Sequence, residues 1–274
     1  MLGIGVNLSI KKLALTMSKK KFILLGLIFQ LALLPLVASA IILLAELDDV
    51  FGYGLLILSL CPGGASSNLF TFLAKGDLEL SSLLTLITGF ITPFTLPIVV
   101  QLLGNLLFQD SYIVQLNILT TIINLLLLTI VPLGLGLALN YYNNELGLKI
   151  SGPLKKISTI FLILVVLGII IKNIPNFNVT FVKGWVPALL LNIIAVSLVL
   201  IICKVFKIEQ SKRITFSIET GIQNGMMALF ITGTLLKNET MSLVPAGYSI
   251  TMYLSAFSIV YAMRRQVKKQ NSML

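Results

Sequence analysis

Glu219 is the acidic residue whose place in the sequence points most directly to chemistry. It belongs to the run Glu219-Thr220-Gly221-Ile222-Gln223-Asn224-Gly225, inside an apolar segment at about 214–236, whereas the other nine acids fall between such segments. A carboxylate at mid-membrane costs roughly 2.5–3.5 kcal/mol on insertion scales. No Lys, Arg or His lies in any predicted span to pair with it. We therefore expect Glu219 to be protonated, either in a proton site or simply hydrogen-bonded to backbone, or to be neutralised by a bound cation.

Oxygen-bearing side chains at other points of the chain suggest which cation. Sodium prefers hard oxygen ligands, as other hard cations do. Such ligands are available from Ser67, Asn68, Ser81, Thr85 and Glu219. Ser81 and Thr85 are four residues apart, so they share one face of a helix. Taken without the others, these two hydroxyls are also compatible with ordinary hydrogen bonds to helix carbonyls.

The stretch Cys61-Pro62-Gly63-Gly64-Ala65-Ser66-Ser67-Asn68 interrupts a long apolar run. Proline and two glycines stop a helix, and the Ser and Asn residues that follow are good caps for restarting one. A break inside a bilayer leaves backbone groups without partners unless it lines a polar cavity. We therefore predict a broken transmembrane helix that lines a polar cavity.

Helices that restart near Ser66 and near Gly225 would each present free N–H groups and a partial positive charge. These features suit a carboxylate, and the side chains of Asn68 and Asn224 are able to hydrogen-bond it. Simple helix capping is the alternative role for Asn224. Because no basic residue lies in a span, these helix starts and bound sodium are the only positive features predicted there. An organic anion is the substrate class that fits them.

Composition restricts the classes of protein that fit. The chain is 57% hydrophobic and 11% charged, with a mean hydropathy of +1.01, which is typical of polytopic membrane proteins embedded in a lipid bilayer. The net charge of +10 sits in short clusters between apolar runs, so we expect no nucleic-acid partner. The absence of His and the presence of only two Cys exclude His-based catalysis and a zinc site. The sequence gives no indication of an organic cofactor or of an oligomeric state.

Eight complete spans are predicted, with an apolar remnant at residues 1–8 before them. The spans cover about 22–45, 50–74, 80–108, 112–139, 157–171, 184–203, 214–236 and 241–263. Polar loops are expected around Lys149, Lys155 and Lys156 and over 173–183. Seventeen of the twenty basic residues fall on one side of this arrangement, and only Lys172, Lys183 and Lys237 fall on the other. The positive-inside rule then predicts a multi-pass protein of the plasma (inner) membrane with a cytoplasmic C-terminus.

The second and seventh spans are both interrupted by glycine and polar residues. Such interruptions at matching places in two halves of a chain indicate inverted repeats around a transport site. The second half contains five spans, so an equal first half would need more than the three spans and remnant present. We therefore expect that the N-terminus is truncated.

The motifs CPGGASSN, followed by FLAKGDLELS, and ETGIQN resemble the two signatures of the bile acid:sodium symporters and their bacterial relatives. The resemblance implies an all-α fold of inverted five-helix repeats with two broken, crossing helices. Within the single transporter domain of 1–274, it implies core helices at 22–108 and 184–263 and panel helices at 112–172.

The resemblance also implies binding residues. One sodium site would use the oxygens already named, and a second would use Gln30, Glu219, Thr220, Ile222 and Gln223, with Thr220 and Ile222 contributing carbonyls. The substrate would meet Ala65, Ser66, Asn68, Asn224 and Gly225. Ala65 stands where the family usually has Thr, and Met226 and Met227 replace smaller residues, which leaves the particular substrate open. An interhelical hydrogen bond is the simpler role for Gln30.

The sequence is thus interpreted as a sodium-coupled symporter that imports bile acids or small carboxylates by alternating access, and not as an enzyme. Proton coupling through Glu219 is the alternative transport mechanism. A membrane sensor is less favoured because no soluble signalling domain is evident. An intramembrane hydrolase would need a second acid, a His or a Ser–Lys pair beside Glu219.

Overall fold

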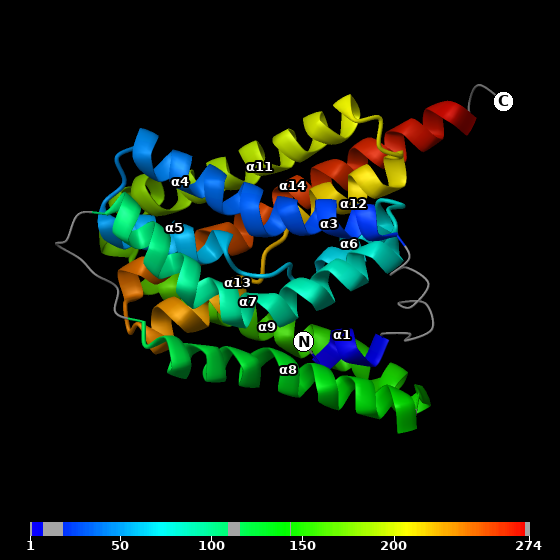
Figure 1. Cartoon of the computed structure of the whole chain (residues 1–274), viewed down its shortest axis with the longest axis horizontal. Helices are drawn as coiled ribbons and strands as arrows, with labels where there is room; N and C mark the ends of the chain where they lie inside the picture. Colours follow the sequence, from blue (N-terminus) through cyan, green and yellow to red (C-terminus); the bar gives the residue numbers. More distant parts are fainter. Residues whose placement is uncertain (1, 8–18, 109–115, 143, 272–274) are drawn as a thin grey trace.

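A computed structural model of the chain describes residues 2–7, 19–108, 116–142 and 144–271. Over these residues it is helical, with one isolated β-bridge (Figure 1). Six helical segments are long and apolar enough to cross a membrane, and two shorter apolar helices, Asp49–Ser59 and Gly225–Leu235, lie between them. The protein is therefore a polytopic membrane protein, as predicted.

The first part of the chain follows the predicted spans closely. A short helix, α1 (Leu2–Asn7), occupies the remnant, whose residues 1 and 8 lie outside the described part. The first span consists of α3 (Lys20–Ile28), η1 (Phe29–Leu33) and α4 (Leu34–Leu44). The broken second span consists of α5 (Asp49–Ser59) and α6 (Ser67–Leu73), and the third span is α7 (Leu78–Leu107).

The middle of the chain departs from the prediction in two places. The predicted start of the fourth span at about residue 112 lies outside the described residues, and α8 is described over Ile118–Tyr142. The polar loop expected around Lys149 to Lys156 is wrong, because α9 runs unbroken over Asn144–Lys172. Glu145 and Lys149 have the (i, i+4) spacing that favours a helix beyond the membrane. The fifth span is therefore the second part of a longer helix.

The loop expected at 173–183 is also wrong. This segment is helical, as η2 (Ile174–Asn176), α10 (Phe177–Val179) and η3 (Thr180–Trp185), and it continues into α11 (Val186–Val205). Pro187 cannot donate a helical hydrogen bond, and the wide π-turns of η3 directly precede it. The same arrangement occurs in the first span, where the π-turns of η1 precede Pro35. A proline therefore does not end either helix.

The second broken span consists of α12 (Gln210–Gly221), α13 (Gly225–Leu229) and η4 (Phe230–Leu235), followed by α14 (Glu239–Asn271). The first halves of the two broken spans lie at the centre of the molecule. Every residue from Phe51 to Ser59 in α5 is buried, and so is every residue from Ile214 to Gly221 in α12. Because a helix buried on all sides needs neighbours all round, α5 packs on α4, α7 and α14, and α12 packs on α6, α7, α11 and α14.

Helices α8 and α9 form an edge of the molecule. They pack on each other and on α1, and Figure 1 places α8 along the side opposite α11. Of the 18-residue apolar stretch that qualifies each long segment as a membrane span, only 17% is buried in α8 and 6% in α9, compared with 44% to 56% in the other four segments. Their exposed residues are largely Leu, Ile and Val, which is the surface that lipid requires. These two helices therefore contact the rest of the protein through a small part of their surface.

Candidate functional site

The two helix breaks lie against each other in the interior. Gly63 and Gln223 form an antiparallel β-bridge. The amide of Gly64 donates to the Ile222 carbonyl at 2.9 Å, and the amide of Asn224 donates to the Pro62 carbonyl at 2.8 Å. Each break thus satisfies backbone groups that the other exposes, where lipid would offer no partner. Neither break would be stable at this depth without the other.

The carboxylate of Glu219 lies beside this crossing and is 1% exposed. Its Oε1 accepts hydrogen bonds from Ser67 Oγ and Ser81 Oγ, both at 2.5 Å. Its Oε2 accepts from Thr85 Oγ1 at 3.0 Å and from Gln30 Nε2 at 3.2 Å. All four donors are neutral and buried. Since no salt bridge of the described residues involves Glu219, a cation or a proton would have to balance its charge.

Four elements supply this cluster: η1, α6, α7 and α12. The predicted shared face of Ser81 and Thr85 is confirmed, because both side chains reach Glu219. Thr85 Oγ1 also lies 3.0 Å from the Ser81 carbonyl, and its single hydrogen can serve either this carbonyl or the carboxylate, so the back-bonding role is available to it. Asn68 joins indirectly: its Oδ1 accepts from Ser82 Oγ at 3.1 Å and lies 2.9 Å from Ser81 Oγ, whose single hydrogen can serve either Asn68 or Glu219.

Gln30 reaches the same cluster from the π-turn of the first span. Its amide nitrogen donates to the main-chain carbonyl of Glu219 at 3.1 Å as well as to the carboxylate. The simpler expectation of an interhelical hydrogen bond is therefore met. Within the described part of the chain, the buried Gln30 Oε1 has no hydrogen-bond partner, and neither do Gln223 Oε1 and Thr220 Oγ1. Buried oxygens without donors are costly unless water or an ion occupies their lone pairs.

The carbonyls predicted to face an ion each have one protein donor. The Thr220 carbonyl accepts from Gln223 Nε2 at 2.9 Å, and the Ile222 carbonyl accepts from the Gly64 amide at 2.9 Å. A carbonyl oxygen has two lone pairs, so each retains capacity for a second partner.

The predicted substrate residues lie at the starts of the second half-helices. Helix α6 begins at Ser67 and α13 begins at Gly225, close to the predicted restarts. Ser66 occupies the capping position of α6 without a side-chain cap bond, whereas Asn224 Oδ1 accepts from the Met227 amide at 3.1 Å. The capping role of Asn224 is thus present. Ala65 is exposed, Ser66 is half-buried, and Gly225 is buried.

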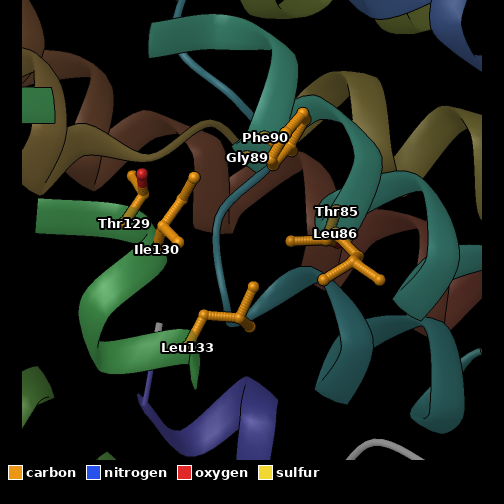
Figure 2. A pocket seen from close by; sticks show the side chains of 7 residues that line it. All are labelled: Thr85, Leu86, Gly89, Phe90, Thr129, Ile130 and Leu133. Atoms are coloured by element: carbon orange, nitrogen blue, oxygen red, sulfur yellow. The ribbon is translucent and has the colours of Figure 1, made fainter. Parts of the chain in front are cut away.

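A narrow pocket of about 10 Å³ lies between α7 and α8 (Figure 2). Thr85 and Gly89 are among its α7 residues, and Thr129 and Leu133 are among those from α8. The volume is about that of one water. Thr85, which also contacts Glu219, therefore belongs both to the wall of this pocket and to the carboxylate cluster.

A larger cavity of about 360 Å³ opens between α9, η4 and α14. Its walls include Val165, Ile169 and Leu229, and at its margin Lys172 and Glu239 form a salt bridge at 2.5 Å. Both charged side chains are largely exposed. This cavity and the pocket of Figure 2 both lie where an edge helix meets the rest of the protein.

Sequence reasoning missed a second polar cluster around the seventh-span break. Asn192 and Tyr248, from α11 and α14, are both fully buried and hydrogen-bond the Gly221 carbonyl. The signal that would have found Asn192 is a carboxamide inside the apolar run Pro187–Ile202. Among the described residues there is no group of three or more His, Cys, Asp or Glu side chains that could hold a metal ion together.

Comparison with known proteins gives a family. The model of the sodium bile acid symporter family matches residues 1–180. An uncharacterized sodium-dependent transporter, YocS, of Bacillus subtilis is 25% identical over 274 residues, covering 99% of this chain and 83% of the relative. The human sodium-dependent organic anion transporter is 26% identical over 274 residues, covering 96% of this chain and 70% of the relative.

A plant relative is longer. The probable chloroplastic sodium/metabolite cotransporter BASS1 of Oryza sativa subsp. japonica is 26% identical over 250 residues, which are 91% of this chain and 60% of that protein. The ETGIQN motif lies beyond the 180 residues that the family model matches, although alignments with relatives extend over nearly the whole chain.

Proposed function

This chain belongs to the sodium bile acid symporter family, and on that premise we propose that it couples sodium to the movement of an organic anion across a membrane. It is a sodium-dependent transporter of that family and not an enzyme. The observation that carries the proposal is the buried Glu219 carboxylate, which contacts three hydroxyls and one amide and has no basic partner among the described residues.

The first sodium would bind among the oxygens around Glu219. Ser67, Ser81 and Thr85 already converge on the carboxylate, and Asn68 Oδ1 is one hydrogen bond away. A hydroxyl that now donates to the carboxylate can rotate its hydrogen away and turn a lone pair toward an ion. Hard oxygens of this kind, with a single carboxylate, suit sodium. No groups would have to move far to form the site.

The second sodium would bind among Gln30, Glu219, Thr220, Ile222 and Gln223. Three buried oxygens support this assignment because they have no hydrogen-bond partner in the described part of the chain, namely those of the Gln30 and Gln223 carboxamides and the Thr220 hydroxyl. The carbonyls of Thr220 and Ile222 would complete the set. Because α12 ends at Gly221 and the chain then becomes extended, these carbonyls no longer point along one helix axis.

The anion would bind near the starts of α6 and α13, against Ala65, Ser66, Asn68, Asn224 and Gly225. Its carboxylate would receive hydrogen bonds from Asn side chains and main-chain amides, and bound sodium would add positive charge. Bile acids and small carboxylates are the substrate classes to be tested. Asn68 belongs to both the sodium set and the substrate set, so filling of one site would affect the other.

Inverted repeats with crossing broken helices account for the arrangement of the core. Two series, α3 to α7 and η3 to α14, each contain a π-bulged helix, a broken helix and a long helix. Asp48, before α5, contacts Lys183 near the start of α11, whereas Asp77, before α7, contacts Thr215 near the start of α12. Helices α5 and α12 therefore begin at opposite ends of the molecule, as inversion requires.

Alternating access would move this core against the panel of α8 and α9, which expose most of their surface. The positive-inside rule supports a cytoplasmic location for the end of the molecule that carries Lys19, Asp77 and the last turns of α14, in a plasma (inner) membrane. Sodium entering a negative-inside cell gains about 2.3 kcal/mol per charge per 100 mV. Two sodium ions would then drive uptake of a monoanion with net inward positive charge.

Uptake of a panel of labelled organic acids into proteoliposomes would test the proposal. A sodium gradient should support uptake, and an equal choline gradient should not. Uptake that is unchanged in choline would overturn it. Proton coupling is the second candidate because Glu219 has only neutral partners, and uptake that follows a pH gradient without sodium would favour it.

A further inference from the structure

A buried polar cluster beside the seventh-span break supplies none of the oxygens assigned above to the two ion sites. Asn192 Nδ2 donates to the carbonyl oxygen of Gly221 at 2.7 Å, and the Tyr248 hydroxyl donates to the same oxygen at 2.9 Å. Asn192 Nδ2 also donates to the Tyr248 hydroxyl oxygen at 3.1 Å. Both side chains have 0% exposure, so water does not compete for these contacts.

The directions of these hydrogen bonds follow from the groups involved. A carboxamide nitrogen has two hydrogens, which here serve the carbonyl and the tyrosine oxygen. The tyrosine has one hydrogen, which serves the carbonyl. The Gly221 carbonyl therefore receives two donors and both of its lone pairs are used, unlike the carbonyls of Thr220 and Ile222, each of which has one donor from Gln223 or Gly64.

The peptide of Gly221 is also held by close packing. A Cβ at this position would lie 2.8 Å from Cγ2 of Val196 in α11 and 3.6 Å from Oγ of Ser255 in α14. Helices α11 and α14 thus contact the glycine itself as well as its carbonyl oxygen. The orientation of this peptide is set by those two helices, at the residue where α12 ends.

We propose that Asn192 and Tyr248 are positioning residues for the second sodium site. By using both lone pairs of the Gly221 carbonyl, they keep that oxygen out of the ion's coordination. By fixing its direction, they set where the neighbouring carbonyls of Thr220 and Ile222 point. This inference rests on the proposed function, because it assumes that these two carbonyls bind sodium.

Tyr248→Phe tests the inference, since it keeps the buried ring and removes one hydroxyl. The readout is the sodium concentration that gives half of the maximal thermal stabilisation of the purified full-length chain, which requires no knowledge of the substrate. Loss of one buried hydrogen bond is expected to raise that concentration by about 3- to 10-fold. Asn192→Leu, which keeps a side chain of similar size and removes both donor hydrogens without adding charge, should raise it further.

Tyr261→Phe is the matched control, because Tyr261 lies on the same helix with 59% exposure and should leave the sodium dependence unchanged. A merely structural role would lower the melting temperature equally with and without sodium and would not move the half-saturating concentration; that result would overturn the inference. If the wild type is stabilised by sodium and both variants match it, only this inference fails. If sodium does not stabilise the wild type, the proposed sodium coupling is itself overturned.

Discussion

Gly63 and Gln223, which are 160 positions apart in the sequence, pair as an antiparallel bridge inside the protein. The glycine is required by its surroundings as well as by the break. A Cβ on residue 63 would lie 2.8 Å from Glu219 Oε2 and 3.3 Å from Gln30 Nε2. The bridge therefore joins the two broken spans and, at the same residue, leaves the space that the carboxylate cluster occupies.

Gly63→Ala should consequently disturb the ion site more than the fold. The added methyl group would force the Glu219 carboxylate or the Gln30 amide to move, and we expect the half-saturating sodium concentration to rise about 10-fold or more, as for lost supporting contacts at metal sites. Sodium-dependent thermal stabilisation measures this. Gly134→Ala is the control, because a Cβ there meets nothing within 4 Å, and helix propensity alone should stabilise it slightly. Equal sodium dependence in the two variants would contradict the role given to Gly63.

Glu219→Gln should abolish sodium dependence while leaving the chain folded. The carboxamide has nearly the same shape, but it removes the charge that a cation would balance and turns one acceptor into a donor facing Thr85 or Ser81. We expect sodium affinity to fall by about 100-fold or more, since even outer-sphere changes cost 10- to 100-fold at metal sites. Isothermal titration with sodium is the measurement. Glu209→Gln, in the exposed residue before the same helix, should bind sodium like the wild type.

Ser81→Ala and Ser82→Ala form a matched pair on adjacent residues. Both hydroxyl oxygens lie within hydrogen-bonding distance of Asn68 Oδ1, but only that of Ser81 also lies within reach of Glu219. We expect Ser81→Ala to raise the sodium concentration for half-maximal uptake about 10-fold, since one hard ligand is lost, and Ser82→Ala to change it less than about 2-fold. If Ser82→Ala raised the half-maximal sodium concentration more than Ser81→Ala, the ion would lie nearer Asn68 than the geometry of the cluster indicates.

The Lys172–Glu239 salt bridge joins the edge helix α9 to α14, so motion of a panel against a core should break it. A reducible thiol cross-linker between Lys172→Cys and Glu239→Cys should lower uptake by roughly 10-fold or more, because alternating access would be blocked. Reduction of the cross-linker should restore uptake. The native Cys61 and Cys203 are buried and should not compete.

The Lys183–Asp48 salt bridge supplies the control for that experiment. It is also largely exposed, with a distance of 2.6 Å, but it joins two parts of the proposed core. Cross-linking Lys183→Cys to Asp48→Cys should leave uptake unchanged. Full transport by the cross-linked 172–239 pair would show that α9 and α14 do not separate during the cycle.

The sequence by itself determined much of this protein. Apolar length located the spans, because lipid tolerates only long apolar helices. Glycine and polar residues located both breaks, with Pro62 added in the first. Glu219 stood out because it was the one acid within a span. The prediction went wrong at Lys149–Lys156 and at 173–183, where polar residues were taken for loops although a helix can continue past the membrane surface.

Only the tertiary structure decided which groups meet. The sequence contains no signal that Gly64 bonds Ile222 or that Asn192 and Tyr248 share the Gly221 carbonyl. Only the resemblance grouped Gln30 with Glu219, and the π-turn from which Gln30 reaches the carboxylate was not predicted. These contacts join residues far apart in the chain, and their partners are chosen by how helices cross. The residue types determine what each group is able to bind. The crossing of the two broken helices determines which oxygens converge on the Glu219 carboxylate.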